Sequence, residues 1–257
     1  MKHIGTILLA SLLLMPTVSA LPHSESTPYS WYCKRNGEHR LPSCDPQLEF
    51  LDRHAAFYAD ENATEEDKVV YLTFDAGYEN GNIAAILDTL RDYDAPASFF
   101  ILSHLAESES GLVARMFDEG HLVCNHTASH RDMSGVKDRE TFLGELSLLE
   151  ETVREATGHE VARYYRPPEG RFSERNLIWA EEAGYTTVFW SFAYADWDNE
   201  KQPDCAAAKQ KILDNLHNGA ILLLHPTSKT NAAILPELLE ELTQAGYRFG
   251  RIDEIDA

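Results

Sequence analysis

Two hydrophobic patterns alternate along most of the chain, starting near residue 69. Short runs rich in branched and aromatic residues are typical of buried strands, and the segments between them carry apolar residues at helical spacing. Strands are expected at 69–74, 97–102, 121–124, 163–165, 185–190, 220–224 and 247–252. Helices are expected before Gly120 and at 82–90, 138–157, 173–183, 205–217 and 234–245. Seven strands separated by helices predict an α/β fold with a parallel sheet, and the short, uneven elements favour an irregular (β/α) barrel.

The residues before this alternating part divide into three segments. Residues 1–20 have the pattern of an export signal, with a positive start, an apolar run and small residues before the expected cleavage site. A retained N-terminal anchor is the alternative, and the sequence does not separate the two. Residues 21–30 are an expected linker, and residues 31–68 an N-terminal arm packed on the barrel. Asp45, followed by a proline, marks a helix start in this arm, and residues 69–257 then form one domain.

Composition narrows the classes of function. The length of 257 residues suits a single α/β barrel, and 44% hydrophobic residues are enough for a core. The formal net charge of −20 argues against a nucleic-acid partner, which needs a basic surface. The export signal predicts a protein that is secreted or lies in the cell envelope, and no later stretch is apolar enough to cross a membrane. We also expect a monomer.

Export makes the four cysteines candidates for disulfides. Cys33 and Cys44 would close a short loop, which stabilises by about 2 to 3 kcal/mol on a loop-entropy estimate. Cys124 and Cys205 would form a second pair, and a buried free thiol at Cys124 is the equal alternative. Four cysteines allow three pairings, and the sequence does not choose between them.

Polar residues with catalytic chemistry follow five of the predicted strands. In a barrel the loops after the strands open on one face, so these residues should share one pocket. They are Asp75, His126, His130, Arg166, Asp196, Trp197 and His225. Taken alone, Asp75 could equally be the cap of the following helix. The catalytic-type residues that follow Asp75 in the chain favour a functional site over a helix cap.

The segment NHTASH carries two imidazoles four residues apart. On a helical turn this spacing places His126 and His130 on one side, where they suit a divalent metal. Most histidine pairs with this spacing are structural. This pair follows a strand, however, which makes it the best metal candidate in the chain.

The segment RPPEG and two later strand ends complete the group. Two prolines stiffen the loop, Gly170 lets the backbone approach a ligand, and Arg166 is able to hold a carboxylate with a bidentate fork. The alternative for Arg166 is a helix cap or a surface ion pair. His225 is placed to exchange protons opposite the first strand's aspartate, and Asp196 would raise its pKa. Trp197 is either a wall of a sugar site or a core tryptophan.

Together these motifs resemble a known family. TFDAG, HTASH, RPPEG, ADW and LLLH, in this order and spacing, are similar to the five motifs of the family 4 carbohydrate esterases. These are the polysaccharide deacetylases that share a nodulation-protein-like deacetylase domain, and the match runs over 69–252. FDAGYENG, WSFAYADWD and YSWYCKRNGEHRLP resemble more narrowly the delta-lactam-biosynthetic de-N-acetylases, which act on muramic acid in spore-cortex peptidoglycan.

The resemblance implies a role for each matching residue. Asp75 would be the general base, Arg166 would orient it, and a backbone N–H, that of Glu169, would help to hold the oxyanion. His225 would be the general acid, tuned by Asp196. The ligands of a divalent metal, with zinc expected before cobalt, manganese or magnesium, would be His126 and His130.

Two departures from the family pattern change the expectation. Ala76 stands where the family has a second aspartate, so the two histidines should hold a metal weakly. Glu169 stands where an aromatic residue is usual, which alters the floor of the sugar site. The expected substrate contacts are Glu169, Gly170, Trp197 and Leu223.

The functional hypothesis is metal-assisted hydrolytic de-N-acetylation of peptidoglycan amino sugars. The expected partner is the glycan strand, and the expected sugar is N-acetylmuramic acid in strands stripped of peptide. One alternative keeps the fold and acts on chitooligosaccharide or acetylated xylan. Another is a non-catalytic protein that binds cell-wall glycan through a decayed metal site.

Overall fold

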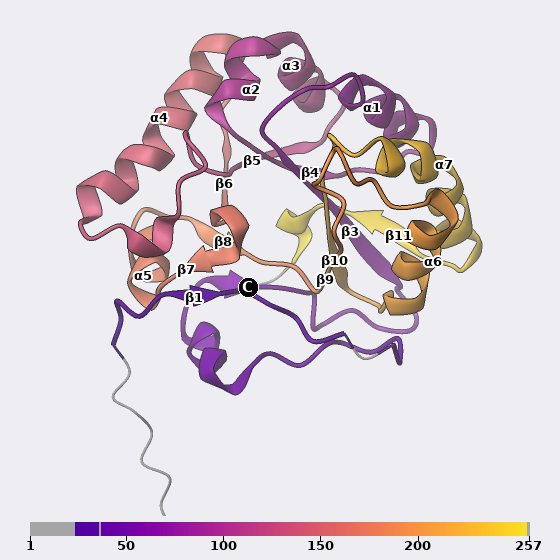
Figure 1. Cartoon of the computed structure of the whole chain (residues 1–257), viewed down its shortest axis with the longest axis horizontal. Helices are drawn as coiled ribbons and strands as arrows, with labels where there is room; N and C mark the ends of the chain where they lie inside the picture. Colours follow the sequence, from indigo (N-terminus) through magenta and orange to yellow (C-terminus); the bar gives the residue numbers. More distant parts are fainter. Residues whose placement is uncertain (1–23, 36, 256–257) are drawn as a thin grey trace, which may run out of the picture.

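A curled parallel β-sheet forms the centre of the molecule in the computed structural model, which describes residues 24–35 and 37–255. Within these ranges the sheet has nine strands, all paired in parallel. Its order is β2 (Ala56–Phe57), β8 (Thr186–Val188), β6 (Ala162–Tyr165), β5 (Leu122–Asn125), β4 (Ser98–Ile101), β3 (Val69–Ala76), β10 (Ala220–Leu224) and β9 (Phe192–Ala193), with β11 (Arg248–Gly250) also on β3. Helices cover the outer side of the curl (Figure 1).

All seven strands expected from the sequence belong to this sheet, which confirms the α/β fold with a curled parallel sheet. Two additional strands, β2 and β9, lie at the two ends of the pairing order. Each is only two residues long, too short to leave a hydrophobic pattern. In the described part of the chain these end strands do not pair with each other, so the barrel is open along one side.

The helices follow the strands in the expected order. They are α1 (Ile83–Asp92), α2 (Ser103–Ser108), α3 (Ser110–Asp118), α4 (Arg139–Thr157), α5 (Glu174–Glu182), α6 (Cys205–Asn215) and α7 (Lys229–Gln244). The single helix expected before Gly120 is in fact the pair α2 and α3. The predicted start of the last helix at 234 is also wrong, because the Ser228 side chain caps the helix and starts it at Lys229. Pro236 therefore lies inside α7 and not in its first turn.

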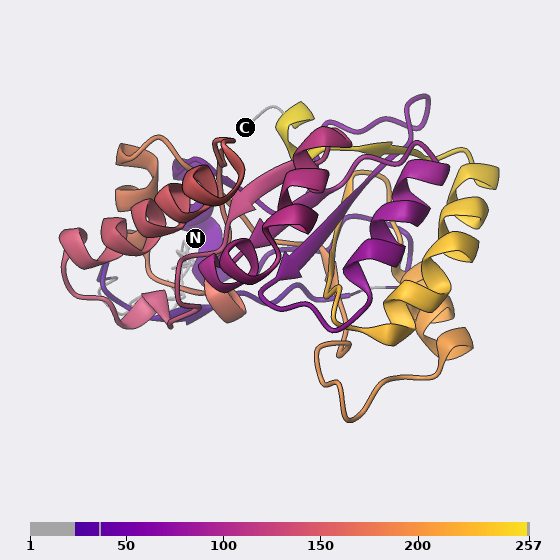
Figure 2. The same cartoon turned by 90° about the horizontal axis from the view of Figure 1, so that it is seen from above.

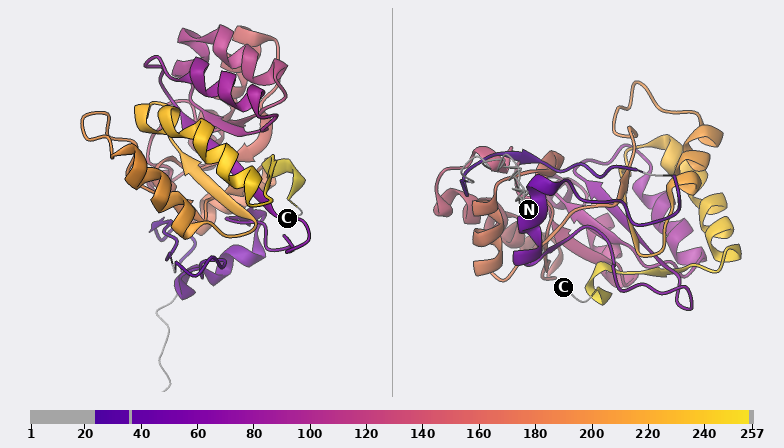
Figure 3. Two further views of the ribbon diagram at one scale, coloured as in Figure 1. Left: turned by 90° about the vertical axis from the view of Figure 1, so that its right-hand side faces the viewer. Right: turned by 90° about the horizontal axis from the view of Figure 1, so that it is seen from below.

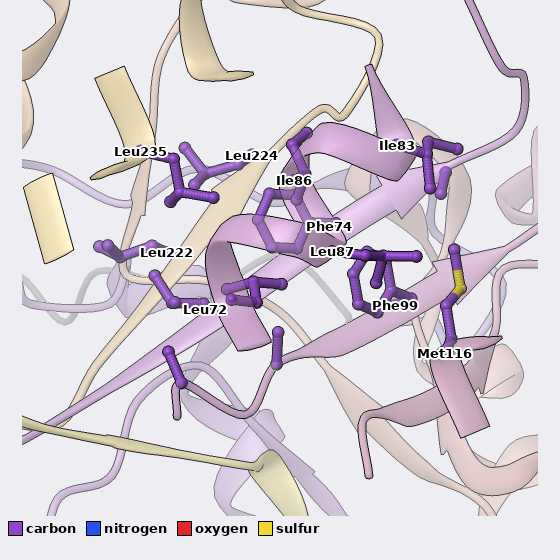
Figure 4. Close-up of a cluster of buried hydrophobic side chains, with 14 of the residues drawn as sticks. Leu72, Phe74, Ile83, Ile86, Leu87, Phe99, Met116, Leu222, Leu224 and Leu235 are labelled. Atoms are coloured by element: carbon purple, nitrogen blue, oxygen red, sulfur yellow. The ribbon is translucent and has the colours of Figure 1, made fainter. Parts of the chain in front are cut away.

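Strand β3 divides its side chains between two layers. Leu72 and Phe74 pack against Ile86 of α1 and Leu235 of α7 in the largest apolar cluster (Figure 4). Because side chains alternate along a strand, the intervening residues point into the curl, and Asp75 is the last of them. A strand buried on both faces is a rigid support for that aspartate.

The N-terminal arm is joined to the barrel by strand pairing. Its 3₁₀ helix η1 (Pro46–Arg53) begins as predicted, with the Asp45 side chain accepting the Gln47 N–H. Strand β2 of the arm joins the main sheet beside β8. Strand β1 (Tyr29–Ser30), in the expected linker, pairs antiparallel with β7 (Arg171–Phe172) (Figure 1). The arm therefore forms part of the barrel wall.

The four cysteines carry free thiols, so the two disulfides considered from the sequence are absent. The Cys33 thiol donates to the Ser191 carbonyl at 2.7 Å, and burial raises its pKa to about 11. Cys44 is half-buried and Cys205 is exposed, while Cys124 is the buried free thiol of the alternative prediction.

The predicted export signal at 1–20 lies outside the described residues. None of the helices between residues 24 and 255 that the structure describes is long and apolar enough to span a membrane.

Candidate active site

A cleft of about 960 Å³ opens where the strands end. Seven of the ten residues predicted for the site line it, namely Asp75, His126, His130, Glu169, Trp197, Leu223 and His225. Arg166 and Asp196 are fully buried behind two of them. The segment between β9 and α6, which carries Trp197, projects from the body of the molecule (Figures 2 and 3).

A buried arginine holds Asp75 in place. Arg166 Nη1 donates to Asp75 Oδ1 at 2.8 Å and to Thr73 Oγ1 at 2.9 Å. Its Nε and Nη2 donate to the carbonyl oxygens of Val188 and Phe189, each at 3.1 Å. Because Nε and Nη2 donate to these carbonyls and only Nη1 donates to Asp75, the predicted bidentate fork is a single hydrogen bond to the carboxylate. The second oxygen, Oδ2, is left for the cleft.

Opposing effects set the pKa of Asp75. Burial raises it, but the positive charges of His126 in its protonated form, of Arg166 and of His225 outweigh burial, and the pKa lies below its usual value. Burial lowers the pKa of His126 to about 4, so this ring is neutral near pH 7. Arg166 then supplies the lasting positive charge, and Asp75 is a carboxylate at neutral pH.

His126 presents a lone pair beside this carboxylate. Its Nδ1 lies 2.8 Å from the carbonyl oxygen of Arg166. Because a carbonyl only accepts, we assign the proton of the neutral ring to Nδ1, which leaves Nε2 as an acceptor. Nε2 faces Asp75 Oδ2 at 3.5 Å. Two acceptors therefore lie side by side at the floor of the cleft.

The helical turn predicted for the two histidines is wrong. Strand β5 ends at Asn125, and in the loop that follows Thr127 and His130 have φ of 75° and 58°. The Asn125 side chain accepts the Thr127 N–H, and the Thr127 hydroxyl accepts the His130 N–H. This tight loop brings the rings of His126 and His130 to 5.1 Å between centres, so the two imidazoles meet by another route.

On the other side of the cleft, His225 is held by a buried carboxylate. Its Nδ1 and its backbone N–H donate to the two oxygens of Asp196, each at 2.8 Å. Asn231 Nδ2 donates to Asp196 Oδ2 at 2.6 Å, and the Tyr194 hydroxyl donates to the Asn231 side-chain oxygen. This network fixes the ring and leaves Nε2 as the nitrogen available to the cleft.

The carboxylate also sets the charge of His225. Burial alone would lower the pKa of this ring, but the hydrogen bond and charge of Asp196 outweigh burial and hold the pKa above its usual value. The pKa values of Asp75 and His225 are therefore shifted in opposite directions. The shifts favour a charged carboxylate at Asp75 and a charged imidazolium at His225.

Two neighbouring residues of the RPPEG loop differ in their placement. Glu169 lines the cleft, whereas Gly170 does not. A Cβ at Gly170 would lie 2.7 Å from the Trp190 ring and 3.0 Å from Trp31 Cβ. Glycine is needed here for this packing and for the left-handed backbone, with φ of 65°, and its predicted contact with substrate stays a prediction. Trp197 is 64% exposed, so the alternative of a core tryptophan is wrong.

Sequence reasoning missed several residues of the site. Thr73 supports the buried arginine, and its spacing of two from Asp75 along a strand was a usable signal. Asn231 supports the buried aspartate from a helix, where its sequence context carried no signal. Three residues of the N-terminal arm also line the cleft, namely Trp31, Tyr32 and Arg35.

Comparison with known proteins places the chain in a family. The polysaccharide deacetylase family model matches residues 62–188. The peptidoglycan-N-acetylmuramic acid deacetylase PdaA of Bacillus subtilis (strain 168) is 36% identical over 99% of this chain and 96% of that protein. The chain belongs to the polysaccharide deacetylases. The solved structure of B. subtilis PdaA, a family 4 carbohydrate esterase, matches this deacetylase with a TM-score of 0.84 and 37% identity, covering 90% of this chain and 97% of that one.

A family 4 carbohydrate esterase from Bacillus anthracis is also similar, with a TM-score of 0.73 and 35% identity over 91% of this chain and 98% of that one. These matches confirm the resemblance inferred from the five motifs. They also confirm the fold of this deacetylase.

Deacetylases of this family are metal-dependent, but the donors of this chain do not fit a site with three protein ligands. His126 and His130 supply two imidazole nitrogens. Ala76, which replaces the usual carboxylate, is fully buried in the apolar cluster on the helix side of β3. Nowhere in residues 24–35 and 37–255 are three or more His, Cys, Asp or Glu side chains grouped to hold a metal ion. The donor set is incomplete for a resident metal.

Substituting Arg166→Gln should reveal the cost of the buried carboxylate. We expect the free energy of unfolding to fall by about 3 to 5 kcal/mol at pH 7, because Asp75 is left charged without a counter-charge. The loss should shrink in acid, since the pKa of Asp75 rises once the guanidinium is gone and protonation then removes the unpaired charge. Urea denaturation at neutral and at acidic pH measures both effects.

The double variant Asp75→Asn with Arg166→Gln is the control for this test. It removes the carboxylate together with the guanidinium and should lose less stability at pH 7 than Arg166→Gln alone. A loss of equal size at both pH values would contradict the assigned charge of Asp75.

Proposed function

We propose that this chain is a hydrolase that removes N-acetyl groups from peptidoglycan amino sugars, above all from N-acetylmuramic acid in strands stripped of peptide. One observation carries the proposal: Asp75 and His225 line one cleft with their pKa values shifted in opposite directions. A carboxylate and a protonated imidazole at neutral pH are the base and the acid that amide hydrolysis needs. The name of the PdaA relative supports the choice of sugar.

The two acceptors at the cleft floor suit a hydrolytic water. A water that donates to Asp75 Oδ2, which lies 3.5 Å from His126 Nε2, turns its lone pairs towards the substrate. Asp75 takes a proton as the water oxygen attacks the acetyl carbonyl carbon. Arg166 occupies the other carboxylate oxygen and so keeps Oδ2 aimed at the water.

His225 completes the reaction from the opposite side. Its Nε2 gives a proton to the sugar nitrogen as the C–N bond of the tetrahedral intermediate breaks. Asp196 stabilises the imidazolium before this transfer. Amide and water become amine and acetic acid, with the water oxygen in the acid.

Exposed aromatic side chains support a glycan as the substrate. Tyr32, Tyr78 and Trp197 line the cleft and are 69%, 61% and 64% exposed. They come from three separate segments of the chain, and exposed apolar surface gathered at one cleft marks a binding site. Flat aromatic faces suit the apolar faces of sugar rings.

Different observations bear on the two alternative functions. A glycan-binding protein without turnover is favoured by Ala76 in the place of a metal ligand. It is disfavoured by the buried networks that aim Asp75 and His225 at one cleft, because binding alone does not need them. Deacetylation of chitooligosaccharide or acetylated xylan would use the same two catalytic groups, Asp75 and His225. Acetate assays on these polymers beside peptide-free peptidoglycan separate the three functions.

The proposed substrate also implies a location. Peptidoglycan lies outside the cytoplasm, so we propose that the protein acts as a secreted or envelope-bound monomer, with glycan strands and no nucleic acid as its partners. The formal net charge of −20 supports the absence of a nucleic-acid partner.

The first test is the release of acetyl groups from peptide-free peptidoglycan strands. Substituting Asp75→Asn keeps the shape of the side chain and removes the base, so the rate should fall by about 10²- to 10⁴-fold. Mass spectrometry before and after incubation shows which sugar loses its acetyl group. The exposed Asp92→Asn variant is the matched control and should behave as wild type. Equal rates for wild type and Asp75→Asn would end the proposal.

The second test uses the pH dependence of kcat/KM. A general acid must be protonated, so activity is lost as pH rises through its pKa. Substituting Asp196→Asn removes the charge that raises the pKa of His225, and the alkaline limb of the profile should move to lower pH. The acidic limb, where Asp75 becomes protonated, should stay in place. An unmoved alkaline limb would assign the acid to another group.

The third test concerns the metal. We propose that a divalent metal, zinc before cobalt, manganese or magnesium, is held only weakly by His126 and His130. Dialysed protein should contain less than one metal per chain by elemental analysis. Calorimetric titration should show weak zinc binding that His130→Ala abolishes. One tightly held metal per chain after dialysis would contradict the incomplete donor set.

A further inference from the structure

The N-terminal arm brings a cation to the cleft. Arg35 lines the cleft, and no other lysine or arginine of the described chain does so. The arm is anchored here along the residues that lead into β9. Trp31 Nε1 donates to the Trp190 carbonyl at 2.9 Å, and the Cys33 thiol donates to the Ser191 carbonyl at 2.7 Å. The Arg35 guanidinium then lies 5.4 Å from the centre of the Phe192 ring.

This guanidinium has no carboxylate partner within the part of the chain that the structure describes. Other arginines do have one, as Arg115 has in Glu119, Arg163 in Glu150 and Arg248 in Asp67. In a chain with 42 acidic and 22 basic residues, partners are plentiful. An arginine left unpaired at a cleft, and held over an aromatic ring, is suited to an anionic group of the substrate.

The proposed substrate carries such a group next to the reacting amide. Muramic acid differs from glucosamine by a lactyl ether on O3, the neighbour of the carbon that bears the acetamido group. In strands stripped of peptide this lactyl group ends in a free carboxylate. In strands that keep their peptides the same carbon is a neutral amide.

We propose that Arg35 binds the lactyl carboxylate of peptide-free N-acetylmuramic acid and thereby sets the specificity of the deacetylase. This inference rests on the proposed function. A planar guanidinium matches a carboxylate with two parallel hydrogen bonds, and it offers no equal match to an amide or to the plain hydroxyl of N-acetylglucosamine. The arm is thus the part of the chain that selects the sugar, while the strand ends carry out the reaction.

The test compares two substrates that differ only at the lactyl carboxyl group. One is peptide-free peptidoglycan strand material, and the other is the same material after its lactyl carboxylates have been coupled to methylamine. Wild type, Arg35→Gln and Lys34→Gln are assayed on both, with mass spectrometry to count acetyl groups lost from muramic acid. Lys34 is exposed, adjacent in sequence and outside the cleft, so its variant removes the same charge as a matched control.

Wild type should prefer the free carboxylate by about tenfold or more in kcat/KM, as expected for hydrogen bonds to a charged group. Arg35→Gln should lose this preference because its rate falls far more on the free carboxylate than on the methylamide, and the turnover that remains on the methylamide shows that the variant is folded. Lys34→Gln should keep the preference.

Other outcomes overturn the inference. An unchanged preference in Arg35→Gln, or an equal loss on both substrates, would show that Arg35 does not recognise the carboxylate. No deacetylation of either substrate by wild type would overturn the proposed function, and this inference with it.

Discussion

The buried guanidinium of Arg166 is the constraint on which the rest of the site depends. A charge without solvent contact is costly unless it is paired and hydrogen-bonded, and here the partners come from separate strands. Asp75 and Thr73 belong to β3, and the carbonyls of Val188 and Phe189 come from the end of β8 and the residue after it. The interaction that satisfies the buried charge thus sets the relative position of the strand ends and aims the carboxylate into the cleft.

The opposite wall of the cleft repeats this arrangement with the signs exchanged. There a buried carboxylate, Asp196, holds the imidazole of His225, and Asn231 of α7 occupies its remaining oxygen. A cation behind the anion keeps Asp75 ionised, and an anion behind the imidazole keeps His225 protonated. The proposed reaction needs these two states at the same pH.

The N-terminal arm adds side chains to the cleft that contains the proposed base and acid. Because the sheet is open between β9 and β2, the arm is able to pass along the residues before β9 and to place side chains in the cleft. Trp31 stacks on Phe189 with ring centres 4.7 Å apart, next to the carbonyl that holds Arg166. The segment that lines the cleft therefore also packs against the support of the Asp75 carboxylate.

The order of strands and helices, and the residues that follow the strands, were determined by the sequence alone. Hydrophobic periodicity reflects burial, which is local to each element, and parallel strands necessarily bring Asp75 and His225 to the same edge. Contacts between distant segments decided the rest. The left-handed residues Thr127 and His130, and not a helical turn, bring the two imidazoles together.

The space at Gly170 is likewise limited by two tryptophans, one of them from the arm. The arm is held at the cleft by hydrogen bonds to residues that lie more than half of the chain away in sequence. The unpaired thiols and the burial of Ala76 among apolar side chains also depend on the packed interior. A one-dimensional pattern records which residues prefer to be buried. It does not record which partners they meet, because those contacts exist only after the sheet has curled.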